Sequence, residues 1–477
     1  MQPELYQDEN LLARLDRMPM TRTAFWIIAL LSLVWIAEAF DIGIIGPVMT
    51  ILKGVWHLSK SQLGLLGVSS TIGIVIGLIP SGIIADRLGR RTVVLGGIAC
   101  FSVLTVLGAF APNFWFLFVI RLLAGVGAGA IFPMPYLFLA EFVRAKRRAV
   151  SVGYSNGVLT AAYLIPSLSA VWAINAFPVD VSWRIPFLLG GLPLVLLIPL
   201  ALWLPESPRF LLKRGRRAEV TRLVEKLERQ AGLPHDTTLI NQRALAVIHQ
   251  GAVRKPTLRA LMRPPYVTRG IIAAAQLTGA FILFYILLVF GPTILMERGF
   301  GSGNAILFTG MMMGIAGIGS ITQGYLADHL GRKWILTIYF FLAAIGCAMF
   351  GLFTSPGLVI VAGLLTSFFG LGVFPVSKLY LAEQFPTRLR GGGVYFGEMT
   401  ARILSGVVTI YSLPFLLHLW GNRVIFEAIA IALLVLALPF VLWGRETARI
   451  SVEEAGTDMS FAELDSEFEP VPGTKLV

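Results

Sequence analysis

Ionisable side chains are rare inside the apolar stretches of this chain, and Arg402 is the most informative of them. It follows the start of its apolar segment by about nine to eleven residues, which at roughly 1.5 Å per residue places it about 14 to 16 Å into a helix. A charge near the middle of a bilayer costs about 2.5 to 3.5 kcal/mol on insertion scales, so it needs a partner or a function. The planar guanidinium donates two parallel hydrogen bonds to a carboxylate, which predicts anion binding at Arg402.

The alternative partner of Arg402 is its own helix. Glu398 lies four residues earlier on the same helical face, where it can form an intrahelical ion pair. The two roles are compatible if Glu398 holds Arg402 until an anion displaces it. We expect Arg402 to bind the substrate.

Two carboxylates indicate a second kind of chemistry. Glu38 and Asp41 are three residues apart and therefore lie on one face of a helix. Burial disfavours the charged form of a carboxylate, which can then load and release a proton near neutral pH. We expect Asp41 to be the main proton carrier and Glu38 the second candidate. Because both lie towards the outer end of their segment, two carboxylates in an exposed vestibule are the alternative.

The elements that hold these residues are membrane-length helices. With 56% hydrophobic and 14% charged residues and a mean hydropathy of +0.77, the chain has too few polar side chains to cover a soluble globule. Segments of about 20 apolar residues can cross a bilayer as helices. They are predicted at residues 24–49, 62–85, 93–110, 114–140, 149–173, 184–204, 268–295, 304–327, 334–353, 357–382, 393–417 and 422–443. We therefore predict an all-α membrane protein with twelve transmembrane helices.

The chain contains the same pattern of residues twice. A common offset of 242 residues, held over about sixty residues, relates the two copies and indicates two homologous six-helix bundles with pseudo-twofold symmetry. Gly82, Asp86, Leu88, Gly89, Arg90, Pro133, Glu141 and Arg148 recur as Gly324, Asp328, Leu330, Gly331, Arg332, Pro375, Glu383 and Arg390.

Basic residues predict the orientation and the regions of the chain. Most loop arginines and lysines fall on one side of the membrane, which is the side retained in the cytoplasm. We predict a cytoplasmic N-terminal segment at 1–23, a first bundle at 24–204, a cytoplasmic linker with short helices at 205–266, a second bundle at 267–443 and an acidic cytoplasmic tail at 444–477. The net charge of +12 is explained by this bias and by anionic lipid, so we expect no nucleic-acid binding.

The repeated pattern resembles the signature of a known family. The run from Gly82 to Arg91 resembles that of the major facilitator superfamily, and the run from Pro205 to Leu211 is similar to the branch that holds sugar porters, organic-ion transporters and bacterial metabolite–proton symporters. The resemblance implies a twelve-helix transporter in which Arg121 takes part in coupling. The glycines between Arg121 and Gly129 lie in an apolar helix and predict close helix packing.

The repeated charges predict a cytoplasmic gate. Asp86 and Arg90 at one helix end can pair with Glu141 or Arg148 at the next, and the mirrored charges can do the same in the second half. We hypothesise that the two clusters hold the protein open to the outside and break when it opens inward. The alternative is that they are insertion signals and surface pairs worth up to about 1 kcal/mol each. The gate set is Asp86, Arg90, Glu141, Arg148, Asp328, Arg332, Glu383 and Arg390, with Glu206 and Glu446 as additional partners.

A narrower resemblance concerns the substrate. The runs Glu383 to Gly391 and Ala401 to Ile403 are similar to organic-anion transporters and bacterial nicotinate and aromatic-acid permeases, in which an arginine of helix 11 meets the substrate carboxylate. The run Trp35 to Gly43 resembles the Asp-Gly-x-Asp pattern of aromatic-acid–proton symporters, with Glu38 for the first Asp. Residues expected to line the cavity are Tyr154, Asn156, Gln276, Phe281, Tyr285 and Phe374, with helix packing as their alternative role.

A sugar porter is the chief alternative. The run Gln276 to Gly279 resembles that branch, but Ala275 and Phe281 stand where its sugar-binding amides are expected, and neither can bind a hydroxyl group. An organic-ion or drug exporter is the second alternative. A non-transporting receptor on the same scaffold is expected to lose Asp41 or the gate charges, which this chain retains. No metal-ligand spacing, nucleophile elbow or nucleotide loop is present, so we expect no enzyme activity and no cofactor beyond the coupling proton.

Together these observations predict a proton-coupled importer of a small organic anion in a bacterial inner membrane. The expected substrate is an aromatic monocarboxylate, with nicotinate first and benzoate-type acids second. Nicotinate is placed first because the run Arg14 to Pro19 resembles the nicotinate permeases. We expect the monomer to be functional.

Overall fold

Helices account for all the regular secondary structure of the described residues. The computed structural model describes residues 3–142, 145–236, 261–264, 266–385 and 387–447. The first half contains α2 (Arg22–Gly43), α3 (Ile45–Val55), α4 (Lys60–Leu88), α5 (Arg90–Gly108), α6 (Phe114–Ile131), α7 (Met134–Phe142), α8 (Ala145–Ala162), α9 (Leu164–Ala176), α10 (Val179–Ser182), α11 (Arg184–Leu189) and α12 (Pro193–Trp203). The second half contains α17 (Tyr266–Tyr285), the π-helix η1 (Ile286–Phe290), α18 (Gly291–Glu297), α19 (Ser302–Leu330), α20 (Arg332–Leu352), α21 (Pro356–Gly370), α22 (Phe374–Glu383), α23 (Thr387–Arg402), the π-helix η2 (Ile403–Thr409) and α24 (Ile410–Trp443).

The helices match the predicted membrane spans. Eleven helical segments within the described ranges are long and apolar enough to cross a membrane. The last of them, Gly392–Trp443, has 52 residues and holds two spans, because Gly421 within it adopts a left-handed backbone with φ of 73°. The prediction of twelve transmembrane helices is therefore confirmed.

The first span differs from its prediction in one respect. It was expected as one helix, but it is divided at Ile44 into α2 and α3. Pro47 explains the break, because proline has no N–H to donate to the carbonyl group of Gly43 four residues earlier.

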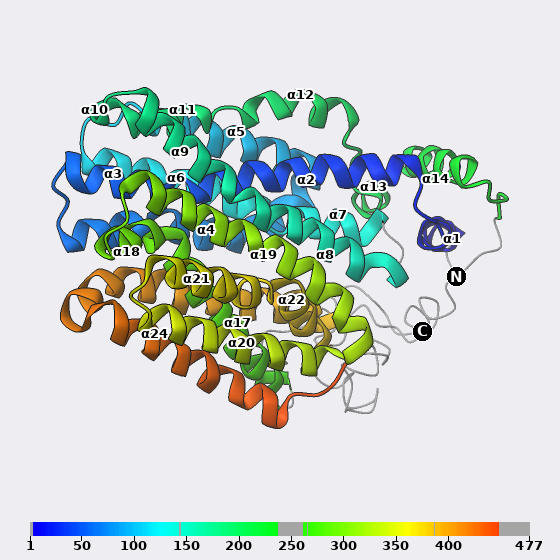
Figure 1. Cartoon of the computed structure of the whole chain (residues 1–477). Coiled ribbons are helices and arrows are strands. Elements are labelled where there is room, and N and C mark those ends of the chain that lie inside the picture. Colours follow the sequence, from blue (N-terminus) through cyan, green and yellow to red (C-terminus); the bar gives the residue numbers. More distant parts are fainter. Residues whose placement is uncertain (1–2, 143–144, 237–260, 265, 386, 448–477) are drawn as a thin grey trace.

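The two halves lie side by side and meet along α8 and α19 (Figure 1). Glycines permit this contact: a Cβ atom at Gly157 would lie 2.8 Å from the Cγ1 atom of Ile321, and one at Gly317 would lie 2.7 Å from the Gly157 carbonyl oxygen. Helix–helix packing in membranes depends on such small residues, because it lacks the hydrophobic driving force available in water.

The predicted glycine packing of the fourth span is confirmed. Gly125 and Gly129 of α6 face the backbone of α4 so closely that any side chain would overlap it, and Gly73 of α4 faces α6 in the same way. Gly127 points to the other neighbour, where a Cβ atom would lie 3.1 Å from Cys100 of α5. The three glycines thus let α6 contact α4 and α5 at backbone distance.

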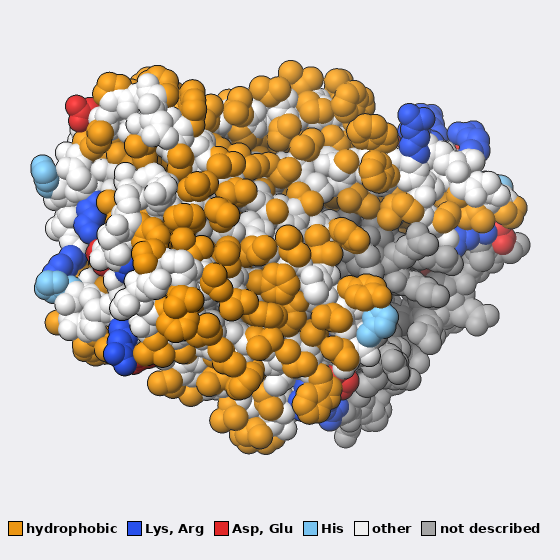
Figure 2. Space-filling model, viewed as in Figure 1, with side chains coloured by type: hydrophobic (Ala, Val, Ile, Leu, Met, Phe, Trp, Pro, Cys, Tyr) orange, Lys and Arg blue, Asp and Glu red, His pale blue; other side chains and the backbone are white. Residues whose placement is uncertain are grey.

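The surface has the polarity of a membrane protein. Figure 2 shows hydrophobic side chains across the middle of the bundle and charged side chains towards its two ends. Large apolar residues such as Phe110, Trp115 and Ile198 are about two-thirds exposed. A surface of this kind is stable only against lipid.

The two ends of the bundle differ. One end, here called the linker end, carries α1 (Pro3–Asp16), α13 (Pro208–Lys213) and α14 (Arg217–Ala231) (Figure 1). At the opposite end, here called the far end, α3 meets α18 across the two halves. The hydroxyl groups of Thr50 and Thr293 are 3.3 Å apart there, and Lys53 lies 3.5 Å from Glu297. The two halves are therefore in contact at the far end.

A small second core holds the N-terminal helix against the linker. Leu11, Leu15 and Met18 are buried against apolar residues of α13 and α14. Beside them the Arg14 guanidinium donates two hydrogen bonds to the Glu228 carboxylate, at 2.9 and 2.6 Å, and Arg17 donates a third at 2.8 Å. The exposed fraction of the Arg14 and Glu228 side chains is only 3% and 4%.

Burial by itself would raise the pKa of Glu228, but the hydrogen bonds and positive charges of Arg14 and Arg17 outweigh it. The pKa of the carboxyl group is therefore held below its ordinary value of 4.5. Because the folded protein favours the ionised form, this contribution to docking is complete above pH 4.5 and is lost as the pH falls through the lowered pKa.

The Glu228→Gln variant is expected to loosen α1. It leaves the buried Arg14 without a counter-charge, which costs about 3 to 5 kcal/mol, whereas Arg17 keeps Asp236 at 4.0 Å. Trypsin should then cut after Arg14 or Arg17 at least tenfold faster than in the unmodified protein at pH 7.5, as followed by mass spectrometry. The matched control is Glu219→Gln, which removes an exposed pair with Arg216 and should change the rate little. Equal rates for both variants would contradict the role assigned to Glu228.

Candidate functional site

Arg402 lies inside the bundle between the two halves. It is the last residue of α23, and only 3% of it is exposed. Its Nη2 atom lies 3.2 Å from Glu398 Oε1, and its Nη1 atom donates a hydrogen bond of 3.0 Å to the Tyr285 hydroxyl. The intrahelical pair with Glu398, which was the alternative to substrate binding in the sequence analysis, is therefore present. Tyr285 of α17 supplies a second partner.

Arg402 and Tyr285 each lie where an α-helix changes into a π-helix. Tyr285 ends α17 directly before η1, and Arg402 ends α23 directly before η2. Extra residues in a helical turn re-aim the neighbouring side chains, and such insertions occur frequently at functional sites.

Aromatic rings enclose the guanidinium. The Cζ atom of Arg402 lies 4.0 Å from the ring centroid of Phe132 and 4.7 Å from that of Phe281, which are cation–π distances. Phe281 is stacked on Tyr285 with centroids 5.8 Å apart, and Phe374 lies 4.9 Å from Phe281. The site combines a cation with flat apolar walls.

Lys378 adds a second cation to the site. Its Nζ atom lies 3.5 Å from Glu398 Oε1 and 4.6 Å from the Phe132 ring centroid. Only 14% of its side chain is exposed, and it lines the central cavity. Its position four residues after Phe374, on the same face of α22, is the signal that places it there.

These residues surround a cavity of about 30 Å³, which has room for about one water molecule. The cavity is lined by Ile42, Phe132, Asn156, Leu159, Thr160, Tyr163, Phe281, Phe284, Tyr285, Phe374, Lys378 and Arg402. Five residues predicted from the sequence are brought together here: Asn156, Phe281, Tyr285, Phe374 and Arg402. Lys378 and Phe132 were missed.

Two predicted cavity residues are not part of this wall. Tyr154 is 58% exposed, because two residues along a helix turn a side chain by about 200° away from Asn156. Gln276 is fully buried, and its amide faces α22: its Oε1 atom accepts a 2.8 Å hydrogen bond from the Ser377 hydroxyl. An amide satisfied by a neighbouring helix is not available to a ligand.

Asp41 and Arg121 form a separate ion pair in the first half. The Nη1 atom of Arg121 lies 2.7 Å from Asp41 Oδ1, with 0% and 1% of the two side chains exposed. Arg121 Nη2 also donates to the Asp41 carbonyl oxygen at 2.8 Å, and the Thr105 hydroxyl donates to the same carboxylate. The two residues that the sequence assigned to coupling are therefore in direct contact.

Glu38 has a different environment from Asp41. It is 1% exposed, and neither carboxylate oxygen has a hydrogen-bond partner among the described residues. In this structure Glu38 and Asp41 are both buried, so the alternative of an exposed vestibule does not apply.

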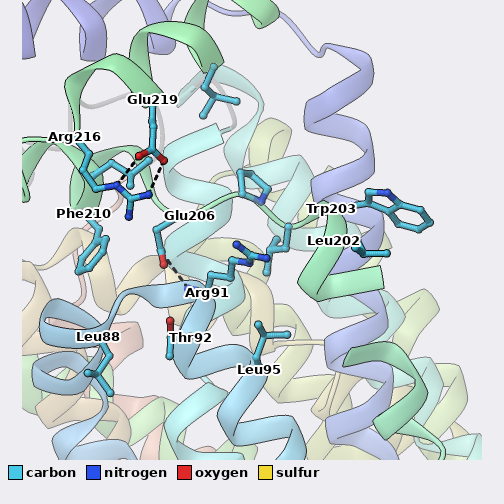
Figure 3. A pocket seen from close by; sticks show the side chains of 14 residues that line it. Leu88, Arg91, Thr92, Leu95, Leu202, Trp203, Glu206, Phe210, Arg216 and Glu219 are labelled. Atoms are coloured by element: carbon cyan, nitrogen blue, oxygen red, sulfur yellow. Dashed lines mark hydrogen bonds and ion pairs between the residues drawn. The ribbon is translucent and has the colours of Figure 1, made fainter. Parts of the chain in front are cut away.

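The repeated charges form two matching clusters at the linker end. In the first half Arg90 pairs with Glu141, which also accepts a 2.6 Å hydrogen bond from the Ser207 hydroxyl. The Glu206 carboxylate accepts from the backbone N–H groups of Arg90 and Arg91 at 2.9 and 3.1 Å, beside a pocket of about 640 Å³ (Figure 3). Burial raises the pKa of Glu141, although Arg90 and Ser207 act against it.

The second half repeats this arrangement. Arg332 pairs with Glu383, the Thr447 hydroxyl donates to Glu383 at 2.6 Å, and Glu446 accepts from the N–H groups of Arg332 and Lys333 at 2.8 and 3.0 Å. A carboxylate at a helix start satisfies free N–H groups and complements the helix dipole.

These ion pairs each join residues of one half. Asp86 was expected to pair with a neighbouring helix end, but its carboxylate lies 3.0 Å from Lys213 of α13, with both side chains about two-thirds exposed. The side chains of Arg148, Asp328 and Arg390 lie outside the described residues, so the gate between the halves stays a prediction.

Comparisons with known proteins agree with this architecture. The sequence profile of the family "Sugar (and other) transporter" matches residues 26–458. The niacin transporter NiaP of Acinetobacter baylyi is 27% identical over 94% of this chain and its own full length. A gallate transporter of Pseudomonas putida is also 27% identical, over 87% of this chain and 93% of its own. The xylose transporter XylE of Escherichia coli, in an inward-open conformation, superposes with a TM-score of 0.72 at 20% identity, covering 91% of this chain and 99% of its own.

The Arg121→Met variant tests the buried pair. It leaves Asp41 ionised without its counter-charge, with only the Thr105 hydroxyl still donating to it among the described side chains, which should lower the free energy of unfolding by about 3 to 5 kcal/mol. Adding Asp41→Leu removes the unpaired charge and should restore much of the loss. Thermal unfolding in detergent measures both.

The control for this experiment is Glu427→Gln, which breaks the exposed pair with Arg423 and should cost no more than about 1 kcal/mol. If Arg121→Met were as harmless as that control, the pair would not be a stabilising element.

Proposed function

The chain belongs to the sugar (and other) transporter family of the major facilitator superfamily, and we propose that it imports a small organic anion coupled to protons. It is a multi-pass membrane transporter rather than an enzyme. The proposed substrate is an aromatic monocarboxylate, with nicotinate first and benzoate-type acids second. The proposed setting is a bacterial inner membrane, with the linker end and both termini in the cytoplasm.

The observation that carries this proposal is the charge of the central cavity. Arg402 and Lys378 share one carboxylate, that of Glu398. The cluster therefore has one positive charge that Glu398 does not balance. In a low-dielectric interior such an excess favours binding of an anion.

The shape of the cavity supports a flat ring. The ring centroids of Phe132 and Phe281 lie 4.0 and 4.7 Å from the Arg402 Cζ atom, and the Phe374 ring lies 4.9 Å from that of Phe281. A carboxylate can take the place of Glu398 on Arg402 while its ring packs between these faces. The cavity is small, so entry requires the halves to separate, as alternating access supplies.

The relatives are compatible with this substrate class. Niacin and gallate, named for two of them, are both aromatic carboxylic acids. A sugar remains the alternative because of the family name and the xylose transporter. Gln276 supported a sugar porter in the sequence analysis, but its amide is turned towards Ser377.

Uptake into proteoliposomes tests the proposal. Radiolabelled nicotinate should enter, unlabelled benzoate should compete, and glucose and xylose should not. Arg402→Ala should lower kcat/KM for nicotinate by about 30-fold or more, because truncating a buried charged partner costs 2 kcal/mol or more. Tyr285→Phe removes one hydrogen bond and should cost about fivefold.

The matched control is Arg423→Ala, since that arginine is exposed at the far end and should transport like the unmodified protein. Nicotinate uptake that survives Arg402→Ala, or competition by hexoses alone, would exclude this substrate class. Efflux driven by the proton gradient, with no uptake, would favour the exporter alternative.

A further inference from the structure

We infer that the pocket between the two halves at the far end is a second binding site for the transported anion, built around Lys53 and Lys60. An anion held there competes with Glu297 for Lys53. This inference rests on the proposed function, because it takes its ligand class from the Arg402 site. The far-end pocket is separate from the central cavity and shares no lining residue with it.

The far-end pocket is large, and both halves supply its walls. Its volume is about 890 Å³, which lies within the roughly 300 to 1,000 Å³ found for small-molecule sites. Lys53 of α3 and Lys60 of α4 come from the first half, whereas Phe290 of η1 and Phe415 of α24 come from the second. The pocket therefore combines cations with aromatic side chains, as the central cavity does.

Basic residues at this end of the protein need an explanation. Lysine and arginine are depleted on the side of a membrane protein that faces away from the cytoplasm, which is the proposed side of the far end. Arg184 and Arg298 have structural partners there, since both donate to backbone carbonyl groups at helix ends, and Arg423 pairs with Glu427. Lys60 has no acidic partner among the described residues. Its charge is available to a ligand.

One glutamate of the pocket faces the two lysines. The Nζ atom of Lys53 lies 3.5 Å from Glu297 Oε1, and each of these side chains is 45% exposed. Glu297 can balance only one lysine, so these three side chains carry one excess positive charge. An exposed ion pair of this kind is weak. An incoming carboxylate can therefore take the place of Glu297 on Lys53, with Lys60 as an additional attraction.

The π-helix η1 connects this pocket to the central cavity. Tyr285, which donates no charge but holds Arg402, directly precedes η1, and Phe290 at the end of η1 lines the far-end pocket. Between these two residues the halves touch at backbone distance, because a Cβ atom at Gly46 would lie 2.1 Å from the Leu288 carbonyl oxygen. The pocket thus holds an anion on the outer side of a contact that alternating access has to open.

The surroundings predict weak binding that depends on charge. Both lysines are exposed to water, so their attraction for a carboxylate is reduced by solvent and by salt. We expect a dissociation constant of about 1 mM or weaker. Nicotinamide has the ring of nicotinate without its negative charge, and it should not bind at the same concentrations.

Lysine footprinting of the purified protein tests the location of the site. The protein is treated with an acylating reagent at low ionic strength, and mass spectrometry measures the modification of each lysine. Nicotinate should slow the modification of Lys53 and Lys60, whereas nicotinamide should not. The internal control is Lys213, which is exposed at the linker end and should react at the same rate with and without nicotinate.

Variants separate this pocket from the central cavity. Arg402→Ala removes a cation of the central cavity, and protection of both lysines should persist because the two sites are separate. Lys60→Gln should raise the nicotinate concentration that half-protects Lys53 by about two- to fivefold, and Glu297→Gln should lower it by a similar factor, as expected for exposed charge contacts. The control Glu427→Gln, which removes another exposed ion pair, should leave this concentration unchanged.

The outcomes distinguish this inference from the proposed function. A protein that transports nicotinate without protection of Lys53 and Lys60 overturns the far-end site and leaves the proposed function intact. Protection that disappears in Arg402→Ala, or in Arg402→Gln if the alanine variant does not fold, also overturns the far-end site, because the change then originates in the central cavity. A protein that neither binds nor transports nicotinate or benzoate overturns the proposed function.

Discussion

The cost of charge in an apolar interior is the constraint on which this structure depends. Two groups of ionised side chains lie inside the bundle, and they are balanced differently. Asp41 and Arg121 neutralise one another and hold the first half together. Arg402 and Lys378 both pair with the Glu398 carboxylate. The anion binding that we propose for the second group depends on this unequal number of positive and negative side chains.

The internal repeat explains why the ends are symmetric and the middle is not. At the linker end, the carboxylates of Glu206 and Glu446 cap the starts of the equivalent helices α5 and α20. Each of these helices follows a glycine in a left-handed backbone conformation, with φ of 95° before α5 and 90° before α20. In the centre, the offset of 242 residues relates Arg402 to Thr160 and Glu398 to Asn156. The Asn156 amide lies 3.4 Å from the Thr160 hydroxyl, so the first half keeps a neutral version of the pair that is charged in the second. The capped helix ends are thus shared by the halves, whereas the charges of the proposed binding site come from one of them.

Much of the fold could be predicted from sequence because membrane insertion leaves strong one-dimensional signals. Hydropathy located the spans, the offset located the halves, and the rarity of charge led to Arg402. What could not be predicted depends on packing in three dimensions. Contacts with neighbouring helices determine three features: α8 is rotated so that Tyr154 points outward, a hydrogen bond occupies Gln276, and the side chain of Lys378 points inward. The docking of α1 depends on Glu228, more than two hundred residues away, and no local pattern indicates it.

A structure of the protein with nicotinate bound tests the central claim most directly. The account predicts that the carboxylate lies within hydrogen-bond distance of the Arg402 guanidinium, with the ring between the aromatic walls and Glu398 displaced from Nη2. It would be contradicted by a ligand bound elsewhere while Arg402 stays paired with Glu398, or by a central cavity that accepts a neutral sugar and not the acid.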